Sequence, residues 1–204
     1  MSHQFDQFVR ASIQERYIIF GVTLRPLSLG HVLLMKRLGC AFAEESESTG
    51  ASIMDLLIAV SICCRKYQEF LDWYNDDDAR NSWITKWYKS IRKESRNKGW
   101  ALMNKFSLFN MYRKEGVDVP LFFDEDDNKD AAKESGAHWI QNIITTLVTE
   151  GRYTDAEIYD LPVSKAFAEY FKILENKGII TLMSDWQIED IKKQKAEAKE
   201  KVAI

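Results

Sequence analysis

The chain has 204 residues, 46% of them hydrophobic and 29% charged, which suits one folded domain with a substantial core. Its net charge of -3 gives no overall attraction to nucleic acid or to acidic membranes. With only 3 prolines and 9 glycines there is little material for many turns, so the composition favours helices over an all-β fold.

The first elements predicted are a short helix and a hairpin. Apolar residues have helical spacing from Phe5 to Ile13. The runs Tyr17 to Phe20 and Val22 to Leu24 are rich in aromatic and β-branched residues and flank Gly21, which predicts two short strands joined by a turn. No apolar stretch of signal-peptide length precedes them, so we expect a cytoplasmic protein.

A second helix is predicted from Leu29 to Leu38. Ser28 can cap its first turn and Gly39 can close its last. The polar stretch Glu44 to Gly50 follows and is typical of a loop.

The stretch Ser52 to Leu71 predicts the core helix. Only Asp55 and Ser61 are polar between Ile53 and Cys64, a run too short to cross a bilayer, which takes about 20 residues. The best helical face is Ile53, Leu56, Leu57, Val60, Cys64, Tyr67 and Leu71. A second row, Met54, Ile58 and Ile62, predicts that the helix packs against two neighbours.

A basic, aromatic helix is predicted from Ala79 to Lys98, and a further helix follows Gly99 as far as Gly116. From Lys86 to Lys105 there are seven Lys or Arg residues against one acid, Glu94. Three interpretations stay open: a stripe that follows a phosphate backbone, a helix whose lysines are simply solvated, or a face that docks on an acidic or amphipathic partner helix.

The acidic, proline-containing stretch from 117 to 130 is the best candidate for a boundary. We therefore divide the chain into a helical core domain with the hairpin (1–116), an acidic linker loop (117–130) and a C-terminal helical region with a charged tail (131–204). The last region contains amphipathic helices over 139–148 and 163–174, the second opened by Pro162 and ended by Gly178.

Signatures of catalysis and cofactor binding are missing from the sequence. It has no glycine-rich phosphate loop, no G-x-S-x-G elbow and no H-E-x-x-H motif, and its three histidines, His3, His31 and His138, are far apart. Cys63 and Cys64 lie in an apolar run, unlike catalytic cysteines, although Arg65 and Lys66 follow them. We expect reduced thiols, no enzymatic activity, no metal and no cofactor.

Three segments resemble the tail assembly chaperones of tailed bacteriophages and related prophages. They are LRPLSLGHVLLMKRLGCAF (Leu24 to Phe42), DLLIAVSICCRKYQEFL (Asp55 to Leu71) and LPVSKAFAEYFKILENKGI (Leu161 to Ile179). The resemblance implies an all-α, mainly helical-bundle protein of the host cytoplasm that acts in virion assembly. It also implies that the chain binds the hydrophobic tape-measure protein, or another tail protein, and keeps it soluble until the tail tube forms.

Two sets of residues are candidates for partner binding. The apolar set is Trp83, Trp87, Trp100, Met103 and Phe106, because aromatics and methionines form adaptable apolar grooves. The basic set is Lys86, Lys89, Arg92 and Lys93, which would also serve the alternative function, nucleic-acid binding or packaging by the basic aromatic helix 79–105. Exposed aromatic faces would also allow self-association.

Overall fold

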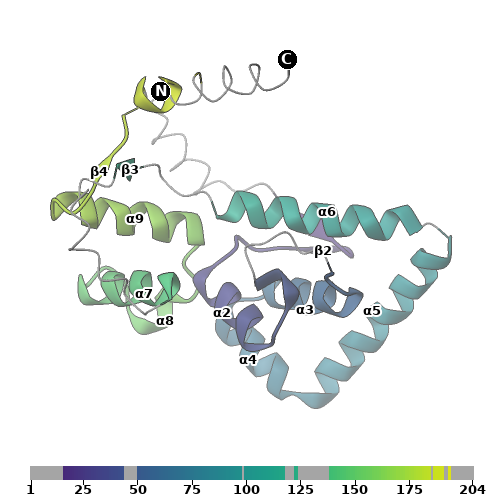
Figure 1. Ribbon diagram of the computed structural model, residues 1–204. Coiled ribbons are helices and arrows are strands. Elements are labelled where there is room, and N and C mark those ends of the chain that lie inside the picture. The colour runs from purple at the N-terminus through teal and green to yellow at the C-terminus, as the bar shows by residue number, and fades with distance from the viewer. Residues whose placement is uncertain are drawn as a thin grey trace.

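A computed structural model of the chain describes residues 16–43, 50–97, 99–117, 122–123, 138–184, 186–190 and 193. Over these residues the protein is mainly α-helical with a small antiparallel hairpin near its start, which confirms the predicted fold class (Figure 1). The helix predicted from Phe5 to Ile13 and most of the charged tail lie outside the described residues.

The hairpin and the second helix form where they were predicted. Strand β1 (Ile18–Ile19) pairs with β2 (Val22–Thr23), and the turn between them places Phe20 and Gly21 at positive φ, 53° and 73°. Helix α2 (Leu29–Arg37) begins at its cap Ser28, whose hydroxyl accepts a hydrogen bond from the His31 N–H at 3.3 Å. The 3₁₀ turn η1 (Ala41–Ala43) follows.

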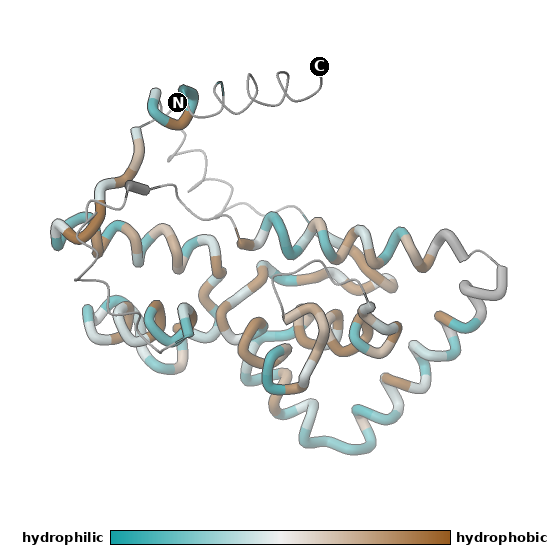
Figure 2. The backbone as a smooth tube through the Cα atoms, viewed as in Figure 1, coloured by the Kyte–Doolittle hydropathy of each residue, from teal (hydrophilic) through white to brown (hydrophobic). Residues whose placement is uncertain are grey.

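Helix α3 (Ile53–Cys63) is the predicted core helix, and most of its residues from Leu56 onwards are buried. The helix is a continuous hydrophobic segment in the middle of the larger of two lobes, the one that contains α2 to α6 (Figure 2). Helix α2 and η1 pack against it. Of the second row, Ile62 is buried, Ile58 is half-buried and Met54 is exposed.

The helix predicted to continue to Leu71 breaks after Cys63, which corrects the prediction. Lys66 is extended, and a new helix, α4 (Tyr67–Asn75), begins after it. Two distant groups hold the break: the His31 ring Nε2 lies 2.8 Å from the Arg65 carbonyl oxygen, and the Tyr67 N–H donates to the Asp160 carboxylate at 2.8 Å. Tyr67 and Leu71 therefore belong to a second helix and not to the face of α3.

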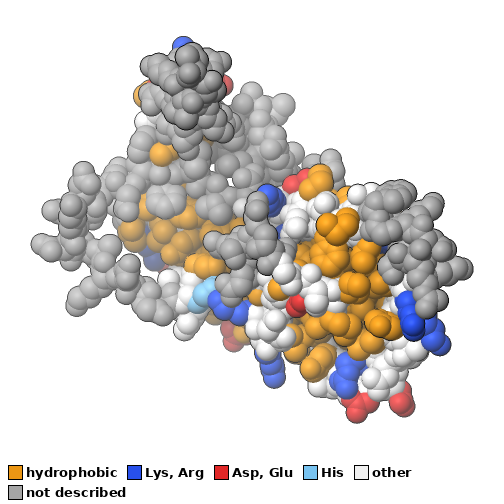
Figure 3. Space-filling view, turned by 45° about the vertical axis from the view of Figure 1, so that its right-hand side comes forward, with side chains coloured by type: hydrophobic (Ala, Val, Ile, Leu, Met, Phe, Trp, Pro, Cys, Tyr) orange, Lys and Arg blue, Asp and Glu red, His pale blue; other side chains and the backbone are white. Residues whose placement is uncertain are grey.

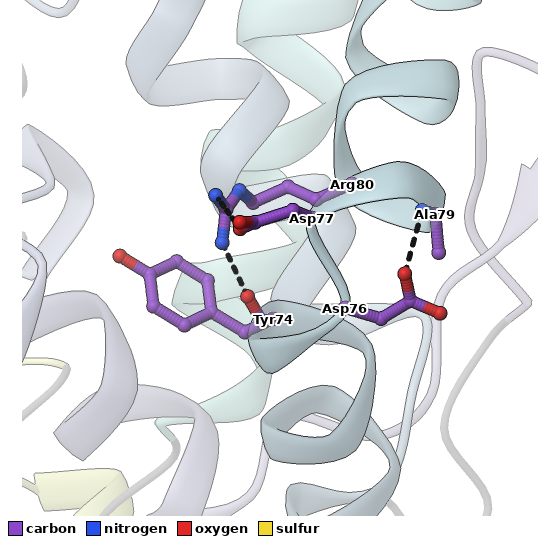
Figure 4. A network of polar contacts seen from close by, with 5 residues as sticks. All are labelled: Tyr74, Asp76, Asp77, Ala79 and Arg80. Atoms are coloured by element: carbon purple, nitrogen blue, oxygen red, sulfur yellow. Dashed lines mark hydrogen bonds and ion pairs between the residues drawn. The ribbon is translucent and has the colours of Figure 1, made fainter.

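Helices α5 (Asp77–Asn97) and α6 (Gly99–Gly116) match the two predicted helices. A sharp corner joins α4 to α5: the Asp76 carboxylate accepts from the Ala79 N–H at 3.0 Å, and Arg80 bonds to the Asp77 carboxylate and to the Tyr74 carbonyl (Figure 4). Because the corner sends α5 away from the body and α6 returns across it, α4, α5 and α6 frame α3.

The smaller lobe contains α7 (Trp139–Thr149), α8 (Asp155–Ile158), α9 (Val163–Asn176) and strand β4 (Thr181–Leu182). The two amphipathic helices predicted here are confirmed as α7 and α9, which pack on each other. The stretch taken as an irregular connection contains a two-residue strand, β3 (Phe122–Phe123), which pairs antiparallel with β4. This pairing joins segments about 60 residues apart, so local sequence patterns do not predict it.

Backbone hydrogen bonds join the two lobes. The Leu29 N–H donates to the Leu161 carbonyl at 3.1 Å, the Gly30 N–H to the Tyr159 carbonyl at 2.8 Å, and the Val163 N–H to the Leu27 carbonyl at 2.8 Å. One hydrophobic cluster also includes buried residues from α2, α3, α6, α7 and α9. The division of the chain at 117–130 stays a prediction.

Candidate functional site

A shallow apolar groove lies between α3, α4 and α5, and we call it the α3–α5 groove. Its lining residues are nearly all apolar: Leu38, Met54, Leu57, Ile58, Ser61, Phe70, Trp73, Tyr74, Arg80, Trp83 and Ile84. Its volume is about 50 Å³. Ligand pockets usually measure about 300 to 1,000 Å³, so this hollow suits one inserted side chain better than a cofactor or small substrate.

Aromatic rings in edge-to-face and tilted contact form the α4 and α5 walls of the groove. The centroids of Trp73 and Trp83 lie 5.4 Å apart, and Trp83 lies 5.4 Å from Trp87. Trp87 in turn meets Phe20 of the hairpin edge-on at 5.0 Å. Such ring pairs add about 0.5 to 1.5 kcal/mol each beyond the area that they bury. The row of rings therefore fixes the spacing between α4 and α5.

Arg65 strengthens the same wall from the break between α3 and α4. Its guanidinium carbon lies 4.3 Å from the Trp73 ring centroid and 5.6 Å from that of Trp83, within the range of cation–π attraction. The guanidinium also donates to the Ser61 carbonyl at 2.7 Å. The break that corrects the predicted core helix thus positions a cation that supports the groove.

The mouth of the groove exposes apolar surface. Met54 at the start of α3 is 43% exposed and Tyr74 at the end of α4 is 38% exposed. Arg80 lies beside them but is bound to Asp77 and to the Tyr74 carbonyl, so its charge is already neutralised. Figure 3 brings forward the side of the molecule where α5 and α6 meet and shows hydrophobic side chains gathered on that face (Figure 3). Isolated exposed apolar residues are ordinary, whereas a contiguous patch indicates a contact surface.

The structure distributes the predicted apolar partner-binding residues over two places. Trp83 is half-buried and lines the groove, while Trp87 is only 8% exposed and supports Trp83 from behind. Phe106 is half-buried against Phe42, with centroids 6.2 Å apart. Met103 is 66% exposed on α6, away from the groove residues. Trp100 lies in α6, but its side chain is outside the described ones.

Three of the four predicted basic residues lie on the solvent side of α5. Lys86, Lys89 and Arg92 are exposed, and the buried residues next to them, Trp87 and Ile91, face Leu57 of α3. Lys93 is on the same helix, with a side chain outside the described ones. The structure thus separates the basic row of α5 from the apolar groove, although both belong to one helix.

The cysteines do not have the environment of nucleophiles. Burial raises the pKa of the Cys63 thiol and of the Cys64 thiol, and it raises the pKa of Cys40 to about 11. A thiol that stays protonated at neutral pH is a weak nucleophile. Among the described residues, no group of three or more His, Cys, Asp or Glu side chains is arranged to hold a metal ion.

In the part of the chain that the structure describes, no helix combines the length and the apolar character needed to cross a membrane. Comparison with family models, with curated proteins and with solved structures found no match to this chain.

Sequence reasoning missed most of the groove. The corner between α4 and α5 separates Trp73 and Tyr74 from Arg80 along the chain. Their spacing in the sequence does not predict that they line the same groove. The available signals were the second apolar row on α3, which begins with Met54 and Ile58, and the predicted partner-binding residue Trp83. A helix that is apolar on two sides must pack against neighbours on both sides. Helices α4 and α5 pack on the second side of α3 but leave part of it exposed at the groove.

Proposed function

We propose that this chain is a non-enzymatic chaperone that binds an amphipathic helical segment of a longer client in the α3–α5 groove. The observation that carries the proposal is the exposed apolar mouth at Met54 and Tyr74 beside a wall of tryptophans in edge-to-face contact. The resemblance to phage tail assembly chaperones names the client class: a tape-measure protein, kept soluble in the host cytoplasm during tail assembly.

The dimensions and chemistry of the groove support helix binding. A hollow of about 50 Å³ holds one apolar anchor, and an amphipathic helix presents its anchors one at a time at i, i+3, i+4 and i+7. The flexible thioether of Met54 and the amphipathic ring of Tyr74 can adapt to different anchors along a repetitive client. A chaperone needs that tolerance because it must bind many similar helical segments.

The test is co-expression of the chain with a tape-measure protein, followed by measurement of the client's soluble fraction and of its co-purification. Met54→Glu introduces a charge at the mouth of the groove without removing a buried side chain. Ile179→Glu is the matched control, since Ile179 is 55% exposed and follows the end of α9, and it is not among the groove residues. Met103→Glu tests the exposed face of α6 separately.

We expect Met54→Glu to lower client solubility and co-purification, and Ile179→Glu to leave both at the wild-type level. If wild-type chain neither binds the client nor raises its soluble fraction, the proposal is wrong. If Met103→Glu has the effect and Met54→Glu does not, the client binds α6 and the assignment of the groove is wrong.

A second candidate function is nucleic-acid binding, favoured by the exposed row Lys86, Lys89 and Arg92 on α5. Binding through phosphate contacts weakens steeply as salt rises. Affinity for single- or double-stranded DNA that falls with salt and is reduced in Lys86→Gln/Lys89→Gln would support this function. Absence of binding at low salt would remove it.

A further inference from the structure

A larger cavity, of about 550 Å³, lies on a different part of the surface, and we call it the junction cavity. It is bounded by α2, by η1, by the end of α6 and by the start of α7. Its apolar lining comes from Leu27, Val32, Met35, Phe42, Val117 and Trp139. The volume is within the range of small-molecule sites, about 300 to 1,000 Å³, and the apolar lining is also typical of such sites.

Among the described residues that line the junction cavity, the polar ones are all basic. Lys36 lines it from α2, Arg113 and Lys114 from α6, and His138 from the cap of α7. None of the described residues that line it is acidic. Arg113 donates to the Phe42 carbonyl at 2.7 Å, which fixes its charge in the wall. Over the described residues, the cavity therefore combines an apolar interior with a rim that contains Lys36, Arg113 and Lys114.

His138 holds Lys36 at the rim of the junction cavity. The ring Nδ1 of His138 lies 3.4 Å from the Ile140 backbone nitrogen at the cap of α7, while the Lys36 ammonium lies 2.8 Å from the ring Nε2. An ammonium can only donate, and a neutral imidazole has one acceptor nitrogen. The shorter contact is therefore a hydrogen bond from the Lys36 ammonium to Nε2, and the ammonium keeps two further N–H donors.

An anionic oxygen at the rim would accept from a remaining N–H of the Lys36 ammonium, with the charges of Arg113 and Lys114 in the same lining. The start of α7 adds the positive end of a helix dipole at the same point. A carboxylate therefore fits the rim, and an apolar chain fits the lining below it. From this we propose that the junction cavity is a binding site for a monocarboxylate with an apolar chain, of the fatty-acid type. The proposal does not depend on the groove or on the chaperone function.

The experiment is isothermal titration calorimetry of the full chain with four probes, each below its critical micelle concentration. Decanoate carries the proposed head and chain, decanol keeps the chain without charge, decylammonium reverses the charge, and acetate keeps the head without the chain. We expect decanoate to bind at one site, decanol to bind at least about tenfold more weakly, as for the loss of one charge-assisted hydrogen bond, and the other two not to bind.

Two charge-removing variants locate the site. Lys36→Gln and Lys114→Gln should each weaken decanoate binding about tenfold and leave decanol binding unchanged. Lys86→Gln removes another exposed lysine, on α5, and is the matched control that should bind decanoate as the wild type does. Thermal unfolding of each variant checks that it is folded.

Three results would overturn the proposal. Decanol binding as tightly as decanoate would show an apolar cavity with no preference for a carboxylate. Equal weakening by Lys86→Gln and Lys36→Gln would show attraction to general surface charge. No heat from decanoate with folded wild-type chain would show that the cavity does not take this ligand class.

Discussion

His31 should make the chain less stable as the pH falls from 8 to 5. The ring is buried, its Nδ1 accepts the Ser28 N–H at 3.2 Å, and its Nε2 lies 2.8 Å from the Arg65 carbonyl oxygen. Both contacts suit the neutral Nε2–H tautomer. Burial lowers the pKa of His31 from 6.5 to about 4, although its hydrogen bond to Arg65 and the nearby Asp160 charge act in the opposite direction.

The sign and size follow from proton linkage. Between pH 6.5 and about 4 the unfolded chain binds a proton at His31 and the folded chain does not, so protonation favours unfolding in this window. The loss is about 2 kcal/mol at pH 5 relative to pH 8 and about 3 kcal/mol at pH 4. Asp55 and Glu157 have lowered pKa values, so the stability that they contribute is lost mainly below this window.

Urea unfolding at pH 8, 7, 6 and 5 measures this effect, with His31→Gln as the comparison. Glutamine at this position can still accept the Ser28 N–H in a capping box but does not titrate. The variant should be less stable at pH 8 and nearly independent of pH down to 5. An equal pH dependence in both proteins, or a His31 ring signal in NMR that titrates near 6.5 in the folded wild type, would refute the reasoning.

Three further outcomes test the packing. Gly30→Ala should destabilise the chain by about 1 to 3 kcal/mol in urea unfolding, since a Cβ there would lie 2.6 Å from the Tyr159 carbonyl oxygen. Phe109→Ala should cost about 3 to 5 kcal/mol because Phe109 is fully buried, and the exposed neighbour Leu108→Ala should cost less than about 1 kcal/mol. Cys63 should resist a thiol reagent at pH 8 in the folded protein and react in urea, because burial raises its pKa; reaction at the unfolded rate without urea would contradict this.

Much of the helical architecture could be predicted because its signals are local. Ser28 and Gly39 bound α2 through their own side chain and backbone conformation, and Gly21 supplies the positive φ that the hairpin turn requires. Asp77 and Asp78 begin α5, where the helix dipole favours negative charge. Each of these signals acts within about four residues, so the sequence alone contains it.

Elements that depend on distant partners could not be predicted. The apolar spacing of α3 continues through Cys64, Tyr67 and Leu71, yet the chain turns there because His31 and Asp160 bind the backbone of the break. The groove also depends on this break in the helix. With an unbroken helix, Arg65 and Trp73 would not reach their present positions beside Trp83. The sequence thus predicted the apolar surface but not the corner that shapes it.

The α3–α5 groove and the junction cavity should act independently. They share no lining residue: the groove is built on α3, α4 and α5 with Leu38 from the cap of α2, whereas the cavity is built on α2, η1, α6 and α7. Coupling between two sites requires an element that changes its arrangement when either is occupied. The element between them is α3 packed on α2, and its inner residues, such as Leu56 and Val60, are fully buried.

A close-packed interior resists small displacements, so a ligand bound at one site should not change the affinity of the other site. Met54→Glu should therefore leave decanoate affinity unchanged, and Lys36→Gln should leave co-purification of the client unchanged. A change of more than about threefold in either crossed measurement would show a coupling of more than about 0.6 kcal/mol, and α2 and α3 would then have to move together when a ligand binds.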